Sequence, residues 1–425
     1  MNDNDRVAEP GGLFKFRVIA TVLLPFGCGY FLSYLYRTVN VVLAPRLATD
    51  LALSAADLGF LTSLYFIVFA AFQTPLGILL DRYGPRRVQG GLLLFAAMGS
   101  ALFAVSDNFV TVSIGRGLIG LGVSGCLMGA LKANVLWFPV RRLPLVNSIT
   151  VAFGSFGALV GTIPVEMAVG MFGWRAIFAA LAVVTVVVAI LTVLIIPEKP
   201  GEDVSRSSVS WREQFRNLRM IYGNPFFWRL CVIVFMQLGV YMAYQALWLG
   251  PWLRDVAGMS PGDVAASLFL FNCGMFAGVL GIGVLADRLQ SFGVQPIVVF
   301  GAGMVGSLLV QLLLALEVVS LARPLCVALG FFGSASVLVY SILARRFPAH
   351  LIGRVNTASN MLTFIAAFAV QWGVGVVINR WPGTAGGGYD PSGHQAALLG
   401  LLAIEVMAFV YFLWPRRHSS LISGE

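Results

Sequence analysis

The chain has 425 residues, of which 58% are hydrophobic and only 11% are charged, and its mean hydropathy is +0.86. A soluble domain carries about 25% charged residues, so this composition excludes an ordinary soluble globule and favours lipid as the solvent. The formal net charge is +9, but the basic residues lie in short loops between apolar segments, which indicates membrane topology rather than binding to nucleic acid.

Apolar segments of about 20 residues, enough to cross a bilayer as a helix, recur along the whole chain. The first is longer than the apolar region of a signal peptide, so we expect no cleavable signal. The sequence predicts twelve such segments, at residues 17–45, 57–80, 87–106, 109–137, 145–170, 174–197, 226–251, 262–286, 294–316, 320–346, 351–380 and 394–414.

A polar interval at residues 198–224, EKPGEDVSRSSVSWREQFRNLRMIYGN, separates the first six segments from the last six. We therefore expect an all-α membrane protein with twelve transmembrane helices. Its parts would be an N-terminal six-helix bundle at 1–197, a linker at 198–224 and a C-terminal six-helix bundle at 225–425. Within the linker, residues 211–222 predict a short amphipathic helix on the membrane surface.

The 28 Lys and Arg residues are distributed unequally between the two sides of the membrane. Loops that face the cytoplasm carry an excess of Lys and Arg. With the N-terminus inside, only five basic residues fall in outer loops: Arg46, Arg175, Arg254, Arg323 and Arg380. The bias predicts that both termini and the linker are cytoplasmic, and the compact loops favour a bacterial inner membrane.

No group of residues indicates an enzyme, a cofactor or a metal site. The five cysteines are scattered singly, and the three histidines (His350, His394 and His418) are expected in loops or tails. The stretches GLGVSG at 120–125 and GAGMVG at 301–306 match the dinucleotide-binding pattern. Both lie inside predicted spans, where glycines favour close helix packing instead.

A short motif repeats at the same place in each half of the chain. GILLDRYGPRRV at 77–88 follows the second span, and GVLADR at 283–288 follows the eighth. Parallel repeats of this kind are typical of duplicated transporters. The first copy resembles the signature loop of the major facilitator superfamily, and RGLIGLG at 116–122 is similar to another motif of that superfamily.

The resemblance implies two bundles around a central cavity that rock to give alternating access. It also implies a conformational latch at the cytoplasmic ends of the helices, in which Arg116 would have a structural or coupling role. The second copy of the loop lacks the trailing basic pair, so its latch would be weaker, and the alternative that these arginines only set topology stays open. The implied latch residues are Asp81, Arg82, Arg86, Arg87, Asp287, Arg288 and Arg116.

Ionisable groups inside a span cost several kcal/mol unless they are paired or hydrated, so each one is a functional candidate. Three basic residues lie within spans: Arg37, Lys132 and Arg116. An arginine cannot lose its proton, and its planar fork suits a carboxylate or a phosphate. Glu166 and Glu405 are the acidic candidates for ion coupling, or for neutralising Arg37 or Lys132 across spans.

The stretch YLYRTVN, from Tyr34 to Asn40, and the following SAADLG at 54–59 resemble the first two helices of organophosphate:phosphate antiporters and anion:cation symporters. The resemblance implies that Arg37 binds the anionic group of the substrate, with Lys132 as a second charge. Span seven has no arginine, which departs from the organophosphate carriers and favours a monoanion or an organic acid over a doubly charged phosphate.

Further candidates for the cavity wall lie in the second half of the chain. Tyr241, Tyr244 and Gln245 have helical spacing and share one face. The alternative reading of this face is hydrogen bonding between helices. The residues expected to bind substrate are Arg37, Lys132, Tyr34, Asn40, Tyr241, Tyr244, Gln245, Asn272, Tyr340 and Asn360.

We therefore expect a secondary transporter of a small organic anion that bears a carboxylate or a phosphate, driven by protons or by a counter-anion. The alternative is an exporter of amphipathic drugs or siderophores, which the aromatic content and the small residues of span five favour. The expected partners are the anionic substrate and the lipid bilayer. We expect a monomer, with no cofactor and no nucleic acid.

Overall fold

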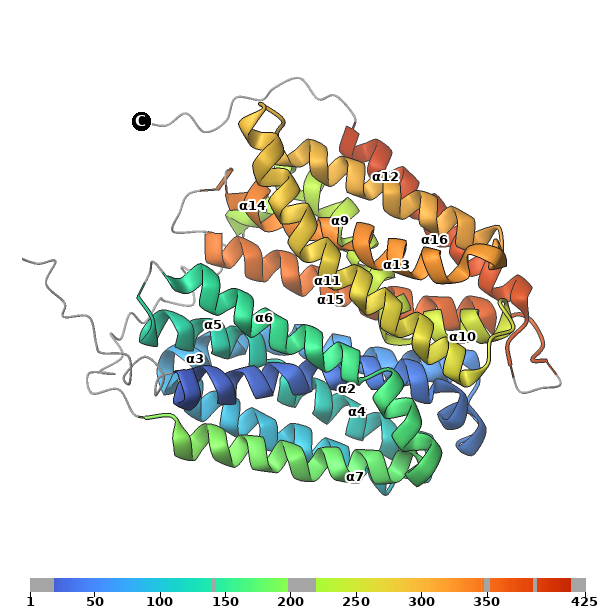
Figure 1. Ribbon diagram of the computed structural model, residues 1–425, viewed down its shortest axis with the longest axis horizontal. Coiled ribbons are helices and arrows are strands. Elements are labelled where there is room, and N and C mark those ends of the chain that lie inside the picture. The colour runs from blue at the N-terminus through green and yellow to red at the C-terminus, as the bar shows by residue number, and fades with distance from the viewer. Residues whose placement is uncertain are drawn as a thin grey trace, which may run out of the picture.

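The computed structural model describes residues 19–139, 142–197, 219–344, 346–347, 352–384 and 388–413. All the regular elements in these residues are helices, and they form two groups, one above the other in Figure 1. The first group comprises η2 (Ile19–Leu23), α2 (Leu24–Asp50), α3 (Ala55–Ala104), α4 (Phe109–Val123), α5 (Cys126–Trp137), α6 (Leu143–Val160) and α7 (Ile163–Ile195).

The second group holds the helices from Pro225 onward, which the colours from yellow-green to red mark in Figure 1. It comprises α9 (Pro225–Ala243), η4 (Tyr244–Trp248), α10 (Leu249–Asp255), α11 (Pro261–Ser291), α12 (Pro296–Ala315), η5 (Val319–Leu321), α13 (Ala322–Gly333), η6 (Ser334–Val337), α14 (Leu338–Ala344), α15 (Ile352–Ile378) and α16 (Pro391–Leu413).

The predicted number of spans agrees with the structure except at the fifth. Within the described residues, eleven helices are long and apolar enough to cross a membrane, and a shorter apolar helix covers residues 145–160. The prediction placed one span at 145–170, but the backbone leaves the helical conformation at Thr162. The next helix starts again with Pro164 in its first turn, a position that proline tolerates because the amide there has no helical partner.

The repeated motif of the first half forms a sharp turn inside α3. Gly84 has φ +75° and joins two successive spans that run in opposite directions. A residue with a side chain would be strained in this conformation, so the glycine of the motif is required by the backbone.

The end of the molecule at which this turn lies is called the Asp81 end. The opposite end, where α10 stops, is called the Asp255 end.

The two groups of helices share one apolar core toward the Asp255 end. In this core Phe69 stacks on Phe364 with ring centroids 4.2 Å apart, and Phe60 meets Trp372 at 5.7 Å. Toward the Asp81 end, the described apolar residues form separate cores. One contains Leu76 and Val88 of the first group only, and another contains residues of the second group only. The packing therefore joins the halves at one end of the membrane.

Parts of the predicted organisation lie outside the described residues. Of the amphipathic helix expected at 211–222, only residues 219–222 are described, and they are helical. The side chain of Tyr340, on α14, is likewise outside the description. The division at 197 and 225 and the cytoplasmic orientation of the termini remain predictions.

Candidate functional site

Arg37 lies near the middle of α2 and is only 5% exposed. Its guanidinium carbon is 4.6 Å from the centroid of the Tyr34 ring and 5.6 Å from that of Phe364, which belongs to the other half. No carboxylate of the described residues comes within 4 Å of it, and its Nε has no hydrogen-bond partner there. The structure thus holds a buried cation at the junction of the halves without an anionic partner.

Arg116 of α4 lies close to Arg37 but is satisfied by neutral acceptors. It donates from Nη1 to the carbonyl oxygen of Tyr36, at 2.9 Å. With the Asn40 amide oriented so that its oxygen faces the guanidinium, Asn40 accepts from all three nitrogens of Arg116, at 2.5 to 3.2 Å. Asn40 was predicted to bind substrate, and the structure uses its oxygen to hold Arg116 against α2.

The Tyr65 ring, on α3, links the two arginines. The guanidinium carbon of Arg116 is 4.7 Å from its centroid and that of Arg37 is 5.8 Å away. Each cation gains from the negative face of the ring, by about 0.5–2 kcal/mol. Neither arginine has an ion-pair partner among the described residues, so two positive charges share this region and favour an anion between the halves.

The second half contributes aromatic and amide groups to the same region. Tyr241 of α9 lies within electrostatic reach of Arg37 and Tyr34, and its hydroxyl has no hydrogen-bond partner among the described residues. Asn360 precedes Phe364 by one turn of α15 and so shares its face. Gln245 and Asn272, by contrast, pair with each other at 3.2 Å inside the second half. The wall opposite Arg37 is neutral in this part of the chain.

Comparison with known proteins gives the family. The sequence profile of the Major Facilitator Superfamily matches residues 26–371. The chain belongs to the major facilitator superfamily. It is 24% identical over 404 residues to the probable sulfoacetate transporter SauU of Cupriavidus necator, a match that covers 88% of this chain and 90% of that protein. It is also 24% identical over 385 residues to the probable L-galactonate transporter of Escherichia coli, covering 83% and 81%.

A solved structure confirms the fold. A bacterial homologue of the human lysosomal transporter Spinster, in an inward-facing and unoccupied conformation, superposes with a TM-score of 0.74 at 16% identity, covering 95% of this chain and 97% of that one. The chain is therefore a secondary transporter of the superfamily and a multi-pass membrane protein, not an enzyme. The fold class and family predicted from the sequence are confirmed.

Lys132 does not join the arginine site of this transporter, contrary to the expectation that it supplies a second charge there. Its Nζ lies 2.5 Å from Asp81 Oδ1 and 2.8 Å from the carbonyl oxygen of Leu80. Leu80 is 15 residues beyond Tyr65 in the sequence, which corresponds to a rise of about 20 Å along a helix. Lys132 therefore serves the Asp81 end of the first half.

Arg116 lies beside Arg37 and not with the rest of the implied latch, whose other residues lie at the Asp81 end. Arg86 donates from Nε to the carbonyl oxygen of Val193 at 2.8 Å, near the last turn of α7, where a cation favours the helix dipole. Arg82 stacks near the Tyr83 ring at 5.3 Å, and Arg87 is exposed. Asp287 and Arg288 are exposed and have no ion pair with another described residue.

The two acidic candidates differ sharply in their surroundings. Glu166 accepts two hydrogen bonds from Arg46, at 2.9 and 3.2 Å. Its charge is therefore balanced by Arg46, and it does not neutralise Arg37. Glu405 of α16 is fully buried, and neither of its carboxyl oxygens has a hydrogen-bond partner among the described residues. Glu405 is therefore a buried carboxyl group without a cationic partner among the described residues.

A buried polar cluster at the Asp255 end was not predicted. Asp255 accepts two hydrogen bonds from Arg254 and one from the amide of Tyr389, and lies 3.3 Å from Nε2 of His394. The expectation that His394 lies in a loop or tail is wrong, because it sits in the first turn of α16 and is fully buried. Burial raises the pKa of Tyr389 to about 12, so its hydroxyl stays neutral.

A distortion in the middle of the seventh predicted span was also missed. Residues Tyr244–Trp248 form a π-helix, and the following Gly250 packs so closely on α2 that a Cβ there would lie 2.7 Å from the carbonyl oxygen of Val41. π-Helical turns occur frequently at functional sites. No sequence signal distinguishes this turn from an ordinary helix. Among the described residues, no group of three metal-ligating side chains is present.

Proposed function

We propose that this transporter moves a small organic anion by alternating access and that Arg37 binds the anionic group. The observation that carries the proposal is the guanidinium of Arg37, which is buried where helices of both halves meet and has no anionic partner among the described residues. An isolated buried charge is costly in a membrane protein and is retained where it has a ligand or a function. A substrate carboxylate or sulfonate would supply the missing negative charge and could accept a bidentate pair of hydrogen bonds.

The neutral wall opposite Arg37 supports a substrate with one anionic group. Arg116 is already held by Asn40 and Tyr36, and the groups from the second half are Tyr241 and Asn360. Hydroxyl and amide groups suit the hydroxyls of a sugar acid better than a second charge. The names of two similar proteins, transporters of sulfoacetate and of L-galactonate, agree with an organic acid.

The packing of the halves supports alternating access. A shared apolar core at the Asp255 end and separate cores at the Asp81 end are what we expect of a state that admits substrate from the Asp81 end. The charge bias of the loops assigns that end to the cytoplasm. Asp81 of the latch motif pairs with Lys132 of its own half in this state.

A thermal-shift screen of the purified protein tests the proposal. The panel contains sulfoacetate, galactonate, glucuronate, phosphate, a neutral hexose and a cationic amphiphile. A ligand at about 100 times its Kd stabilises the folded state by about 2.7 kcal/mol, which is readily detected. We expect organic anions to stabilise the wild type and not Arg37→Gln. Preferential stabilisation by the cationic amphiphile would overturn the anion proposal and favour a drug exporter.

A further inference from the structure

Glu405 is a carboxyl group that the anion site does not use. It lies past the middle of α16, it is fully buried, and neither carboxyl oxygen has a hydrogen-bond partner in the part of the chain that the structure describes. No described cation lies within 4 Å of it. A carboxylate in such a place would carry an uncompensated charge, which costs several kcal/mol, whereas the protonated form carries none.

The neighbours of Glu405 provide groups that suit a protonated carboxyl. Gln311 of α12 and Tyr244 of the π-helix lie within interaction range of it. The Oε1 of Gln311 is a buried acceptor without a partner among the described residues, and so is the hydroxyl of Tyr244. A protonated Glu405 has an O–H to donate to Gln311, and Tyr244 can donate to the second carboxyl oxygen. One added proton would thus satisfy several buried polar atoms.

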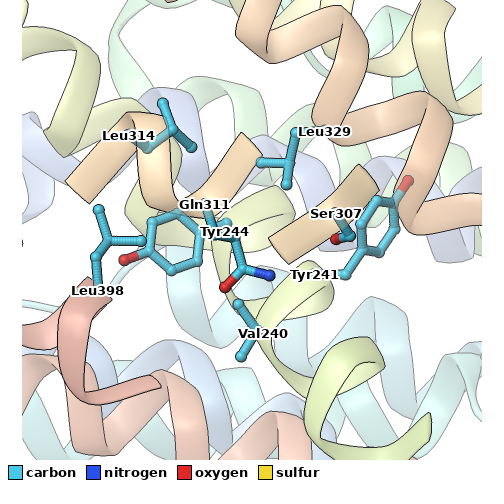
Figure 2. A pocket seen from close by; sticks show the side chains of 8 residues that line it. All are labelled: Val240, Tyr241, Tyr244, Ser307, Gln311, Leu314, Leu329 and Leu398. Carbon is cyan, nitrogen blue, oxygen red and sulfur yellow. The ribbon is translucent and has the colours of Figure 1, made fainter. Parts of the chain in front are cut away.

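A small cavity lies beside this cluster, between Tyr244 and Tyr241. Its polar lining residues are Tyr241, Tyr244, Ser307 and Gln311. Figure 2 shows Gln311 projecting between the two tyrosines, with Tyr244 toward Leu398 of α16. Tyr241, at the other side of the cavity, is the residue within electrostatic reach of Arg37. Polar side chains therefore lie between Tyr241, which interacts with Arg37, and Gln311 and Tyr244, which lie near Glu405.

We propose that Glu405 is the proton-binding site that couples a proton gradient to movement of the anion. This proposal rests on the proposed function. The Glu405 carboxylate accepts one proton from the side to which the site is open, forming one O–H bond, and that bond breaks when the proton is released on the other side. The buried apolar packing of α16 tolerates the neutral form, so the loaded halves rock only when Glu405 is protonated. The empty transporter returns after the anion and the proton have both been released, so each cycle moves one proton with the anion.

Other ionisable groups near α16 lie too far from Glu405 to replace the proton. The Arg254, Asp255 and His394 cluster is at the start of the helix, and His394 is 11 residues away, a rise of about 16 Å. On the other side, Arg229 of α9 donates to the carbonyl oxygen of Phe412, about 10 Å further along. Among the described residues, the titratable group that faces Glu405 from the packed helices is Tyr244.

Transport in proteoliposomes tests the coupling, with radiolabelled galactonate as the probe. Counterflow requires only anion exchange, whereas accumulation against a gradient requires the proton. We expect the wild type to show both, and Glu405→Gln to keep counterflow while losing at least tenfold in accumulation driven by a pH gradient. Glu166→Gln is the matched control, since its carboxylate pairs with Arg46, and it should keep both activities.

The outcomes separate this proposal from the proposed function. If Glu405→Gln accumulates galactonate like the wild type, or if the wild type shows counterflow but a pH gradient drives no accumulation, the Glu405 proposal is overturned and the transport function stands. If the wild type shows no counterflow, the proposed function fails for this anion, and the protonation of Glu405 is decided by the following measurement.

Infrared spectroscopy of the purified protein in H₂O and D₂O reports the protonation directly. We expect the carbonyl band of a protonated carboxyl in the wild type and in Glu166→Gln, and its loss in Glu405→Gln. An unchanged spectrum in Glu405→Gln would show that Glu405 is ionised at rest and would overturn the proposal. Replacing a neutral carboxyl by an amide of the same size should preserve the fold, which the melting temperature checks.

Discussion

The guanidinium of Arg37 lies over the ring of Tyr34, 4.6 Å from its centroid and three residues further along the same helix. Tyr34 thereby holds the charged group in place while leaving its nitrogens available. We expect Tyr34→Leu to weaken binding of the anion by about 0.5–2 kcal/mol, or roughly 2- to 30-fold. Tyr34→Phe, which keeps the ring, should bind as the wild type does. Titration of both variants with the anion found in the screen checks this, and equal losses in the two would show that the hydroxyl matters instead.

Arg116 is expected to act on stability rather than on substrate affinity. Its guanidinium satisfies Asn40 and the carbonyl oxygen of Tyr36 inside the first half. Lysine cannot reach both acceptors, and leaving buried groups unsatisfied costs about 1–3 kcal/mol each. Arg116→Lys should therefore lower the melting temperature. A variant with unchanged melting temperature and no anion binding would mean that Arg116 contacts the substrate.

Lys132 is expected to be dispensable for anion binding. It pairs with Asp81 at the end of the molecule remote from Arg37, and both side chains are partly exposed, so the pair is worth about 1 kcal/mol at most. Lys132→Ala should change the anion Kd less than twofold and alter instead the balance between conformations. A tenfold loss of anion affinity, in the direction expected for Arg37→Gln, would show instead that Lys132 belongs to the anion site.

Closure at the Asp255 end depends on glycine contacts between the halves. A Cβ on Gly375 of α15 would lie 2.4 Å from the carbonyl oxygen of Ala55, whereas one on Gly373 would meet nothing within 4 Å. We expect Gly375→Ala to separate the halves at this end and Gly373→Ala, the matched control, to leave them together. Spin labels at the exposed positions Val105 and Arg380, in a background without the native cysteines, report the distance. An unchanged distance in Gly375→Ala would contradict the sealing role.

The sequence predicted what depends on local composition and spacing. Apolar length located nearly all the spans, the glycine of the repeated motif marked the turn at Gly84, and the charge within span one singled out Arg37. A partner from another helix cannot be read in this way, because spans that are apolar on every side show no periodicity that orients them. Lys132 therefore was assigned to Arg37, and the structure pairs it with Asp81.

The features that sequence reasoning missed arise from packing between distant segments. His394 reaches Asp255 only because α16 lies against the end of α10. The π-helix at Tyr244–Trp248 consists of residues that fit an ordinary helix equally well. Glu405 was placed within a span and named as a candidate for ion coupling, but the neutral surroundings that isolate it come from α12 and the π-helix. None of these three features can be recognised without the three-dimensional arrangement of the helices.

The central claim is that Arg37 binds the transported anion, and counterflow in proteoliposomes tests it most directly. Arg37→Gln keeps the size and polarity of the side chain but removes the charge. With the wild type and Lys132→Ala as controls, and with insertion checked by the melting temperature, we expect Arg37→Gln to lose at least 100-fold in the rate of anion exchange, or about 2.7 kcal/mol. Exchange at the wild-type rate by correctly folded Arg37→Gln would contradict the account.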